Sequence, residues 1–355
     1  MSAQTDRLDA VDGVRTLAIL WVALYHYAVF WTPAGRGDDL VPYGEALAWI
    51  PFADLGHLGV SMFFVVSGFV IAFSLERSAS ALDFAARRLL RLWPTLLICG
   101  TLTFVATSLL GPAELVRGPV EYAVSLLFLP PEHVGRALGL PGLEWLDGAY
   151  WSLWVEVRFY GVAALLFWLA RRRFLLAWTA FVLVCAVIQA RLGADHALSG
   201  LLFTEFQPFF TLGIALAAMR SQGIEPGPLA LFLLGAMQAL IYAPEDSAHL
   251  GALLALIALT TLACLTRRPL PVLSARPVTR IGRASYAYYL LHQNLGLAVL
   301  AALSTLGALG TGLGIAAMLA VQAGIVLLSI FLTERVEQPL GRRLRAALPR
   351  ASAPA

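Results

Sequence analysis

The fold is decided by residues 13–31, GVRTLAILWVALYHYAVFW, an apolar run long enough to cross a bilayer as one helix. This run contains two groups that a membrane span normally avoids, Arg15 and His26. Their spacing places both on one face of a helix, roughly 16 Å apart along its axis. An ionisable residue inside a span indicates function by default. The alternative is that Arg15 snorkels to the lipid headgroups and His26 only hydrogen-bonds a neighbouring helix.

The composition predicts an all-α polytopic membrane protein. Hydrophobic residues make up 59% of the 355 residues and charged residues 13%, whereas soluble domains carry about 25% charged residues. The apolar runs are too long for barrel strands. The arginines fall mainly in predicted cytoplasmic loops, so no nucleic-acid partner is expected. The three cysteines lie in separate apolar runs, so we expect neither a disulfide nor a metal site.

About ten transmembrane helices are predicted from the apolar runs. A further run, residues 119–130, is only about twelve residues long and is typical of a re-entrant or interfacial segment. The predicted spans are residues 13–31, 55–75, 92–111, 150–170, 174–191, 198–219, 228–243, 248–265, 284–303 and 311–332.

The distribution of arginines predicts the orientation. With ten crossings and a cytoplasmic N-terminus, 19 arginines fall in inner segments and four in outer segments. Counting residues 119–130 as a crossing would move two arginine groups outside, against the positive-inside rule. We therefore expect a multi-pass protein with both termini in the cytoplasm. Residues 1–340 would form one membrane-embedded domain, and residues 341–355 a short basic cytoplasmic tail.

The second predicted span has Ser67-Gly68 near its middle. Small residues there allow close approach either of another helix or of a thin ligand, and both interpretations remain open.

A cluster of arginines follows that span. Residues 84–94, FAARRLLRLWP, contain Arg87, Arg88 and Arg91 and end at Pro94, which is expected near the start of the next helix. The arginines either determine topology only or bind a polyanion, because guanidinium groups bind phosphate in a bidentate manner.

The fourth predicted span begins YWSLWVEVRFYG and places Glu156 roughly 9 Å inside the outer surface. Arg158, two residues on, points elsewhere and does not form a simple helical ion pair with it. A buried carboxylate needs a partner or a raised pKa. Glu156 is therefore a candidate general base or a structural anchor.

Two later spans carry polar residues. In residues 282–294, GRASYAYYLLHQN, the spacing of Ser285, Tyr289 and His292 places them on one helix face, with Tyr286 one step away. Such a face either holds a bundle together or lines a cavity. In the sixth predicted span, TEFQPFFTLG contains the polar residue Glu205 and also Pro208, which is expected to kink the helix.

Six motifs in order resemble the acyltransferase-3 family of integral membrane acyltransferases, over nearly the whole chain. The motifs are R-x10-H at Arg15 and His26, FFVVSGF at 63–69, RRLLRLWP at 87–94, WSLWVE-x-x-FY at 151–160, SYAYYLLH at 285–292 and VEQP at 336–339.

This resemblance implies an enzyme of the bacterial inner membrane. The enzyme would transfer an acyl group, with acetyl expected, from cytoplasmic acyl-CoA to a hydroxyl of an extracytoplasmic glycan or glycolipid such as lipopolysaccharide. Acyl-CoA would be a substrate, with no bound cofactor. The expected catalytic residues are His26, Glu156 and His292. The expected acyl-CoA-binding residues are Arg15, Arg87, Arg88, Arg91, Ser67, Ser285, Tyr286 and Tyr289.

The sequence departs from some family members because no fused hydrolase-like domain follows the spans. The acceptor step is then left to the membrane domain itself or to a separate periplasmic acyltransferase partner.

The residues themselves support this interpretation in part. Acylation of a hydroxyl needs a base that works near neutral pH, and imidazole suits this role. The competing hypothesis is a secondary transporter or lipid-linked sugar flippase, a class that often shows repeated halves. No such repeat is evident. A purely structural membrane protein fits poorly with so many ionisable groups inside spans.

Overall fold

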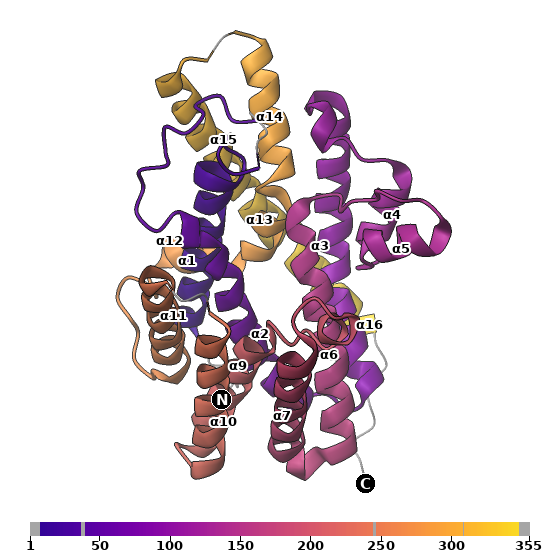
Figure 1. Cartoon of the computed structure of the whole chain (residues 1–355), viewed down its shortest axis with the longest axis vertical. Coiled ribbons are helices and arrows are strands. Elements are labelled where there is room, and N and C mark those ends of the chain that lie inside the picture. Colours follow the sequence, from indigo (N-terminus) through magenta and orange to yellow (C-terminus); the bar gives the residue numbers. More distant parts are fainter. Residues whose placement is uncertain (1–7, 37–39, 244–245, 308, 348–355) are drawn as a thin grey trace. The chain divides into compact units, whose positions relative to one another are not determined.

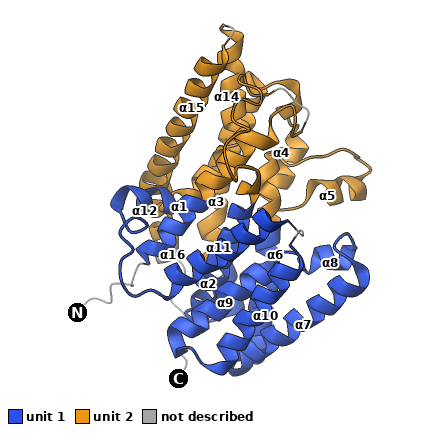
Figure 2. Ribbon diagram, turned by 60° about the vertical axis from the view of Figure 1, so that its left-hand side comes forward, with its two compact units in different colours: residues 1–18, 58–86, 155–282 blue, residues 19–57, 87–154, 283–355 orange. Residues whose placement is uncertain are grey.

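The computed structural model describes residues 8–36, 40–243, 246–307 and 309–347, and all regular structure in these ranges is helical (Figure 1). The all-α prediction is therefore confirmed. The chain divides into two compact units, each made of three separate segments (Figure 2). Unit 1 comprises residues 1–18, 58–86 and 155–282, and unit 2 comprises residues 19–57, 87–154 and 283–355.

Three helices contribute more than one residue to each unit: α1 (Asp9–Tyr25), α3 (Ala81–Leu110) and α6 (Trp151–Ala170). The other helices of unit 1 are α2 (Leu58–Glu76), α7 (Phe174–Leu192), α8 (Ala197–Leu201), α9 (Gln207–Gln222), α10 (Pro226–Ile241), α11 (Ser247–Leu265) and α12 (Arg276–Arg283), whose last residue begins a segment of unit 2. Those of unit 2 are α4 (Pro119–Leu126), α5 (Pro131–Leu138), α13 (Ser285–Leu291), α14 (Asn294–Thr305), α15 (Thr311–Leu332) and α16 (Gln338–Ala347).

Six helical stretches of the described residues are long and apolar enough to cross a membrane. They are Asp9–Phe30, Asp54–Glu76, Ala81–Leu110, Gly148–Leu192, Ser247–Leu265 and Thr311–Leu344. Gly148–Leu192 contains two of the predicted spans. Of the shorter apolar helices, α10 overlaps the predicted span 228–243, and α14 overlaps the second half of 284–303. The total of ten spans stays a prediction, as do the single domain and the cytoplasmic tail, of which residues 348–355 lie outside the described residues.

Unit 1 is held together by close packing of α2 against α9. A Cβ atom on Gly68 would lie 2.3 Å from the carbonyl oxygen of Phe210, and one on Gly213 would lie 2.1 Å from that of Val65. No side chain fits at such distances, so both glycines allow the two backbones to touch. Gly68 therefore serves helix packing, one of the two interpretations left open by the sequence.

Unit 2 has an aromatic and aliphatic core where residues that follow α1 pack against α14 and α15. Tyr27, Trp31 and Tyr43 are buried against Leu297 of α14 and Met318 of α15. In the described residues between α1 and α2, 26–36 and 40–57, the chain turns repeatedly and forms no α-helix. Packing of this segment against α14 and α15 fixes the C-terminal end of α1 within the unit.

The expectation that a helix begins near Pro94 is wrong. α3 begins at Ala81, so Pro94 lies inside it. Ser80 and Asp83 cap this start reciprocally: the amide of Asp83 donates to Ser80 Oγ at 3.1 Å, and the amide of Ala79 donates to the Asp83 carboxylate at 3.0 Å. These bonds satisfy backbone donors that a helix start leaves open.

Two predicted continuous spans are broken. Residues 198–219 divide into α8 and α9, because the chain turns at 202–206 and Phe203 adopts a left-handed conformation with φ 43°. Pro208 lies in the first turn of α9, where its missing N–H costs nothing, so it does not kink a span. Residues 284–303 divide into α13 and α14 at His292 and Gln293.

Candidate active site

The break between α13 and α14 lies at a sequence-predicted residue, His292. Its amide makes the last bond of α13, to the carbonyl of Tyr288 at 2.8 Å. Gln293 then adopts φ −88° and ψ −85°, and α14 begins at Asn294. All three residues of this polar triplet are buried. The break therefore leaves backbone and side-chain polar groups inside an apolar unit, where each needs a partner.

His26 meets His292 at this break. The regular geometry of α1 ends at Tyr25, and His26 begins a π-helical turn that extends to Phe30. His26 Nδ1 lies 3.0 Å from His292 Nε2, and His292 Nδ1 lies 2.8 Å from the carbonyl oxygen of Tyr289. His292 is buried and His26 is half-buried. Two residues that the sequence analysis singled out separately thus form one hydrogen-bonded pair in unit 2.

The backbone of His292 is fixed as firmly as its ring. Its carbonyl oxygen accepts a hydrogen bond from the hydroxyl of Tyr27 at 2.7 Å and another from Gln322 Nε2 at 3.2 Å. Gln322 is itself oriented by the hydroxyl of Tyr288, which donates to its Oε1 at 2.5 Å. The sequence analysis did not identify Tyr27 or Gln322.

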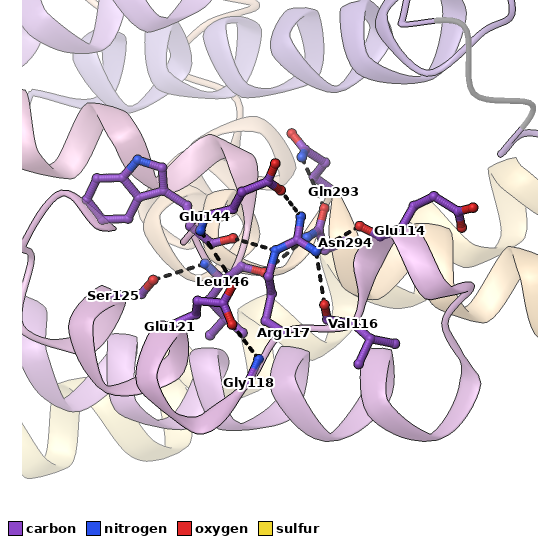
Figure 3. Close-up of polar contacts among 11 residues, drawn as sticks. Glu114, Val116, Arg117, Gly118, Glu121, Ser125, Glu144, Leu146, Gln293 and Asn294 are labelled. Carbon is purple, nitrogen blue, oxygen red and sulfur yellow. Dashed lines mark hydrogen bonds and ion pairs between the residues drawn. The ribbon is translucent and has the colours of Figure 1, made fainter. Parts of the chain in front are cut away.

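The segment 112–149, which the arginine distribution predicts to lie outside and which is called the outer segment below, is fastened by polar contacts in unit 2 (Figure 3). Arg117 donates to the carbonyl of Glu114 at 2.8 Å and to that of Val116 at 3.0 Å, and pairs with the carboxylate of Glu144. Glu121 accepts from the amide of Gly118 at 2.6 Å. The helix α4, at eight residues, rises only about 12 Å, so it is too short to cross a membrane.

Asp147, near the end of this segment, is fully buried and was also missed by the sequence analysis. Its Oδ2 accepts from the amide of Asn294 at 2.8 Å and its Oδ1 from the amide of Ala149 at 2.9 Å. Burial raises the pKa of this carboxyl to about 7, although the two amide bonds and the charge of Arg117 act in the opposite direction. The signals available in the sequence were the Asp147-Gly148 turn dipeptide and the polar triplet His292-Gln293-Asn294 inside an apolar run.

Glu156 anchors a second polar group, in unit 1. Ser67 Oγ of α2 donates to Glu156 Oε1 of α6 at 2.6 Å, and the hydroxyl of Tyr160 donates to the same oxygen. Ser67 is buried and Glu156 is half-buried. Both hydroxyl donors bind one carboxylate oxygen, so the group links α2 to α6 through side chains alone.

Arg15 belongs to unit 1 and His26 to unit 2. Arg15 forms an ion pair with Asp12, 3.7 Å away and one turn earlier on α1. Asp12 is buried, and Gly282 of α12 packs so closely on its backbone that a Cβ there would lie 1.8 Å from its carbonyl oxygen. The guanidinium is thus held beside a carboxylate at the start of α1.

The three arginines of the predicted donor site all lie on α3 and belong to unit 2. Arg87 and Arg91 are exposed and lie one turn apart on one face, while Arg88 is half-buried. Tyr286 Oη of α13 donates to the carbonyl of Leu92, beside Arg91 on α3, at 3.1 Å.

The remaining predicted residues on α13 contact the chain itself. The hydroxyl of Tyr289 donates to the carbonyl of Ala149 at 2.5 Å and lies 2.7 Å from Ser152 Oγ. Ser285, at the start of α13, is buried. The predicted residues therefore form separate groups: His26 with His292 in unit 2, and Ser67 with Glu156 in unit 1.

Comparison with known proteins gives a consistent result. Residues 8–334 match the acyltransferase-3 family, which is described as an acyltransferase domain. The acyltransferase MdmB of Streptomyces mycarofaciens is 29% identical over 325 residues, which cover 82% of this chain and 80% of that protein. An O-acetyl transferase of Shigella phage Sf6 is 34% identical over 97 residues, 27% of this chain and 26% of that protein. No solved structure matches the chain.

Proposed function

Because this membrane protein belongs to the acyltransferase-3 family, we propose that it transfers an acyl group from cytoplasmic acyl-CoA to a hydroxyl of an extracytoplasmic glycan or glycolipid. Acetyl is the simplest acyl group for this reaction. The observation that carries the proposal is the chain of hydrogen bonds from Tyr289 through His292 to His26.

This hydrogen-bond chain determines which nitrogen can act as a base. The carbonyl of Tyr289 can only accept, so Nδ1 of His292 carries the proton that lies between them. Nε2 of neutral His292 then has a lone pair and accepts a hydrogen bond from Nδ1 of His26. Nε2 of His26 is left without a proton. It is the basic nitrogen of the pair, and it belongs to the half-buried residue.

The proposed reaction uses this nitrogen as a general base. His26 Nε2 takes the proton of the acceptor hydroxyl as its oxygen attacks the thioester carbonyl. The carbon–sulfur bond breaks, and the thiolate of CoA leaves with the proton that His26 had taken. His292 accepts the hydrogen bond from His26 Nδ1 throughout, which orients the ring and stabilises the imidazolium between the two steps. Transient attachment of the acyl group to His26 would use the same nitrogen.

We assign donor binding to the arginines. CoA carries several phosphates, and guanidinium groups bind phosphate through paired hydrogen bonds. Arg87 and Arg91 present an exposed cationic face on α3, and Arg15 and Arg88 are further candidates. Placement of the arginines at the cytoplasmic side, with both termini inside and the protein in the bacterial inner membrane, rests on the positive-inside rule.

The contacts of the other predicted residues favour structural roles over direct roles in binding or catalysis. The hydroxyls of Tyr286 and Tyr289 bond to carbonyls of the chain itself, which favours positioning of α13 over direct contact with acyl-CoA. The contacts of Glu156 with Ser67 and Tyr160 favour a structural anchor over a general base.

Transfer of a labelled acyl group in proteoliposomes tests the proposal. Purified protein is reconstituted, labelled acetyl-CoA is supplied on the cytoplasmic face, and an acceptor glycan on the other face. The proposal predicts label on the glycan and free CoA in equal amounts. Transport of the glycolipid without transfer of label would support the flippase alternative and overturn the proposal.

A further inference from the structure

Residues 146–150 bind both sides of the helix break at His292. On the α14 side, Asn294 donates its amide to Asp147 at 2.8 Å and its side-chain Nδ2 to the carbonyl of Leu146 at 3.0 Å. On the α13 side, the hydroxyl of Tyr150 donates to the carbonyl of Leu290 at 3.0 Å. The outer segment is therefore attached to the backbone directly before and after His292.

Asp147 occupies the centre of this contact. One carboxylate oxygen caps the N-terminus of α14, and the other caps the short helix Gly148–Tyr150. A helix N-terminus has free amides and a partial positive charge, and both favour an ionised carboxylate. Gly148, the next residue, packs against Gln293 so closely that a Cβ would lie 2.9 Å from its Nε2.

We propose that the ionised carboxylate of Asp147 is a positioning group that holds the α13–α14 break, and with it His292 and the basic nitrogen of His26, in the active arrangement. The part of this proposal that concerns activity rests on the proposed function. The part that concerns the break stands on the contacts of Asp147 alone.

Protonation removes this support for a geometric reason. Both oxygens of Asp147 accept from backbone amides. Protonation turns one of these oxygens into a hydroxyl and removes the negative charge, so one of the two bonds is lost or becomes a weak bond to a hydroxyl oxygen, and neither is charge-assisted any longer. Either the N-terminus of α14 then loses its cap, or the short helix Gly148–Tyr150 loses its own.

Arg117 is the charged group that acts on this carboxyl, and the carboxylate in turn acts on two tyrosines near it. Arg117 of the loop before α4 favours the ionised form. Tyr27, from the π-helical turn after α1, and Tyr150, from the short helix Gly148–Tyr150, lie close enough for the charge of the carboxylate to favour their neutral hydroxyls. Burial outweighs Arg117 and gives Asp147 a pKa of about 7.

The raised pKa of Asp147 makes the stability of the fold depend on pH. The direction of this dependence indicates that the ionised carboxylate has a role other than stabilisation. The ordinary pKa of an aspartate is about 3.9, so over the range from about 4 to 7 the folded protein binds a proton that the unfolded chain releases. The contribution of Asp147 to the free energy of unfolding therefore falls as the pH rises through this range. At pH 8 the ionised group is retained although its ionisation opposes folding, which is typical of functional positions.

Hydrogen exchange of the α14 amides tests the proposal without relying on activity. At pH 8, Asp147→Asn should accelerate exchange at Asn294 and the first turn of α14 by roughly 10- to 100-fold, because a charge-assisted hydrogen bond is lost. The wild-type protein at pH 5.5, corrected for the intrinsic pH dependence of exchange, should show the same change. This pH series requires no variant, so it decides the question even where Asp147→Asn fails to fold.

Glu144→Gln is the matched control, because Glu144 lies in the same segment but is exposed and pairs with Arg117 rather than capping α14. It should leave exchange in α14 unchanged. Equal acceleration in Glu144→Gln would assign the effect to docking of the whole segment and overturn the role of the Asp147 carboxylate. Wild-type protection that does not depend on pH between 5.5 and 8 would overturn it as well.

The kinetic readout then connects the break to the reaction. In Asp147→Asn, kcat should fall about tenfold or more, because small misplacements of a catalytic group are costly, while KM for acyl-CoA stays unchanged. We expect kcat of the wild type to fall on acidification, because the carboxylate of Asp147 and the base His26 are protonated. In Asp147→Asn this decrease should become shallower. A normal kcat together with an altered α14 would overturn the positioning role. An inactive wild type would instead refute the proposed function and leave the exchange result intact.

Discussion

The His26–His292 pair of unit 2 and the Ser67–Glu156–Tyr160 group of unit 1 are both polar clusters within apolar helices, but they are built differently. The imidazoles meet where α1 turns π-helical and α13 ends, so backbone groups are available there. Ser67 and Glu156 lie inside the unbroken helices α2 and α6 and contact each other through side chains alone.

This difference is the reason why we propose a base in one cluster and a structural anchor in the other. A break frees carbonyl and amide groups, and the carbonyl of Tyr289 fixes the proton on His292 Nδ1. An unbroken helix has its backbone satisfied, so a hydroxyl or carboxylate in it can be oriented only by other side chains. We infer that helix breaks orient the reactive imidazoles, whereas polar groups inside unbroken helices hold the helices together.

The largest effect is expected from His26→Gln. Glutamine keeps a hydrogen bond to His292 but cannot take a proton near neutral pH, so kcat should fall by about 10²–10⁴-fold. His133→Gln, at an exposed position on α5, is the matched control and should leave kcat unchanged. Near-normal turnover by folded His26→Gln protein would reduce the pair to a contact between helices.

A smaller effect is expected from removing the exposed charges of α3. Changing Arg87 and Arg91 together to glutamine should raise KM for acyl-CoA at least about tenfold with kcat little changed, since each charge-assisted contact contributes about 1.5–3 kcal/mol before screening by salt. Arg172 and Arg173, also exposed, provide the control pair. An unchanged KM for acyl-CoA in the α3 variant would leave Arg87 and Arg91 with a role in topology alone.

The smallest effect on turnover is expected in unit 1. Glu156→Gln retains an oxygen that can accept from Ser67 and Tyr160, so we expect kcat to fall less than about tenfold. Glu156→Ala leaves both hydroxyls without this partner. A buried donor left unsatisfied costs about 1–3 kcal/mol of the free energy of unfolding, so the melting temperature should fall. A loss of kcat in Glu156→Gln as large as in His26→Gln would make Glu156 a base and remove the distinction between the two clusters.

Hydropathy and motifs predicted the helical class and the family, and both are confirmed. The helix breaks were harder to predict, because an apolar run such as residues 284–303 has the composition of one span. The polar triplet at 292–294 was the local signal that this run is interrupted. Likewise the Ser80–Asp83 cap, visible in the sequence, would have placed the start of α3 before its arginines.

The contacts within the site could not be predicted locally. His26 and His292 are 266 residues apart in the chain, and Asp147 and Asn294 are 147 apart. Helical periodicity relates residues within one element only. It identified both imidazoles as candidates, but it contains no information on which nitrogen of each ring holds the proton.

The protonation state of His26 tests the central claim most directly. Nitrogen-15 NMR of histidine-labelled protein in lipid distinguishes protonated from unprotonated ring nitrogens, and His26→Gln and His292→Gln assign two of the six histidines. We predict that at pH 8 both His26 and His292 carry their proton on Nδ1, so that Nε2 of His26 is the free base. A proton on Nε2 of His26 would contradict the account, because that nitrogen could then accept no proton from the acceptor hydroxyl.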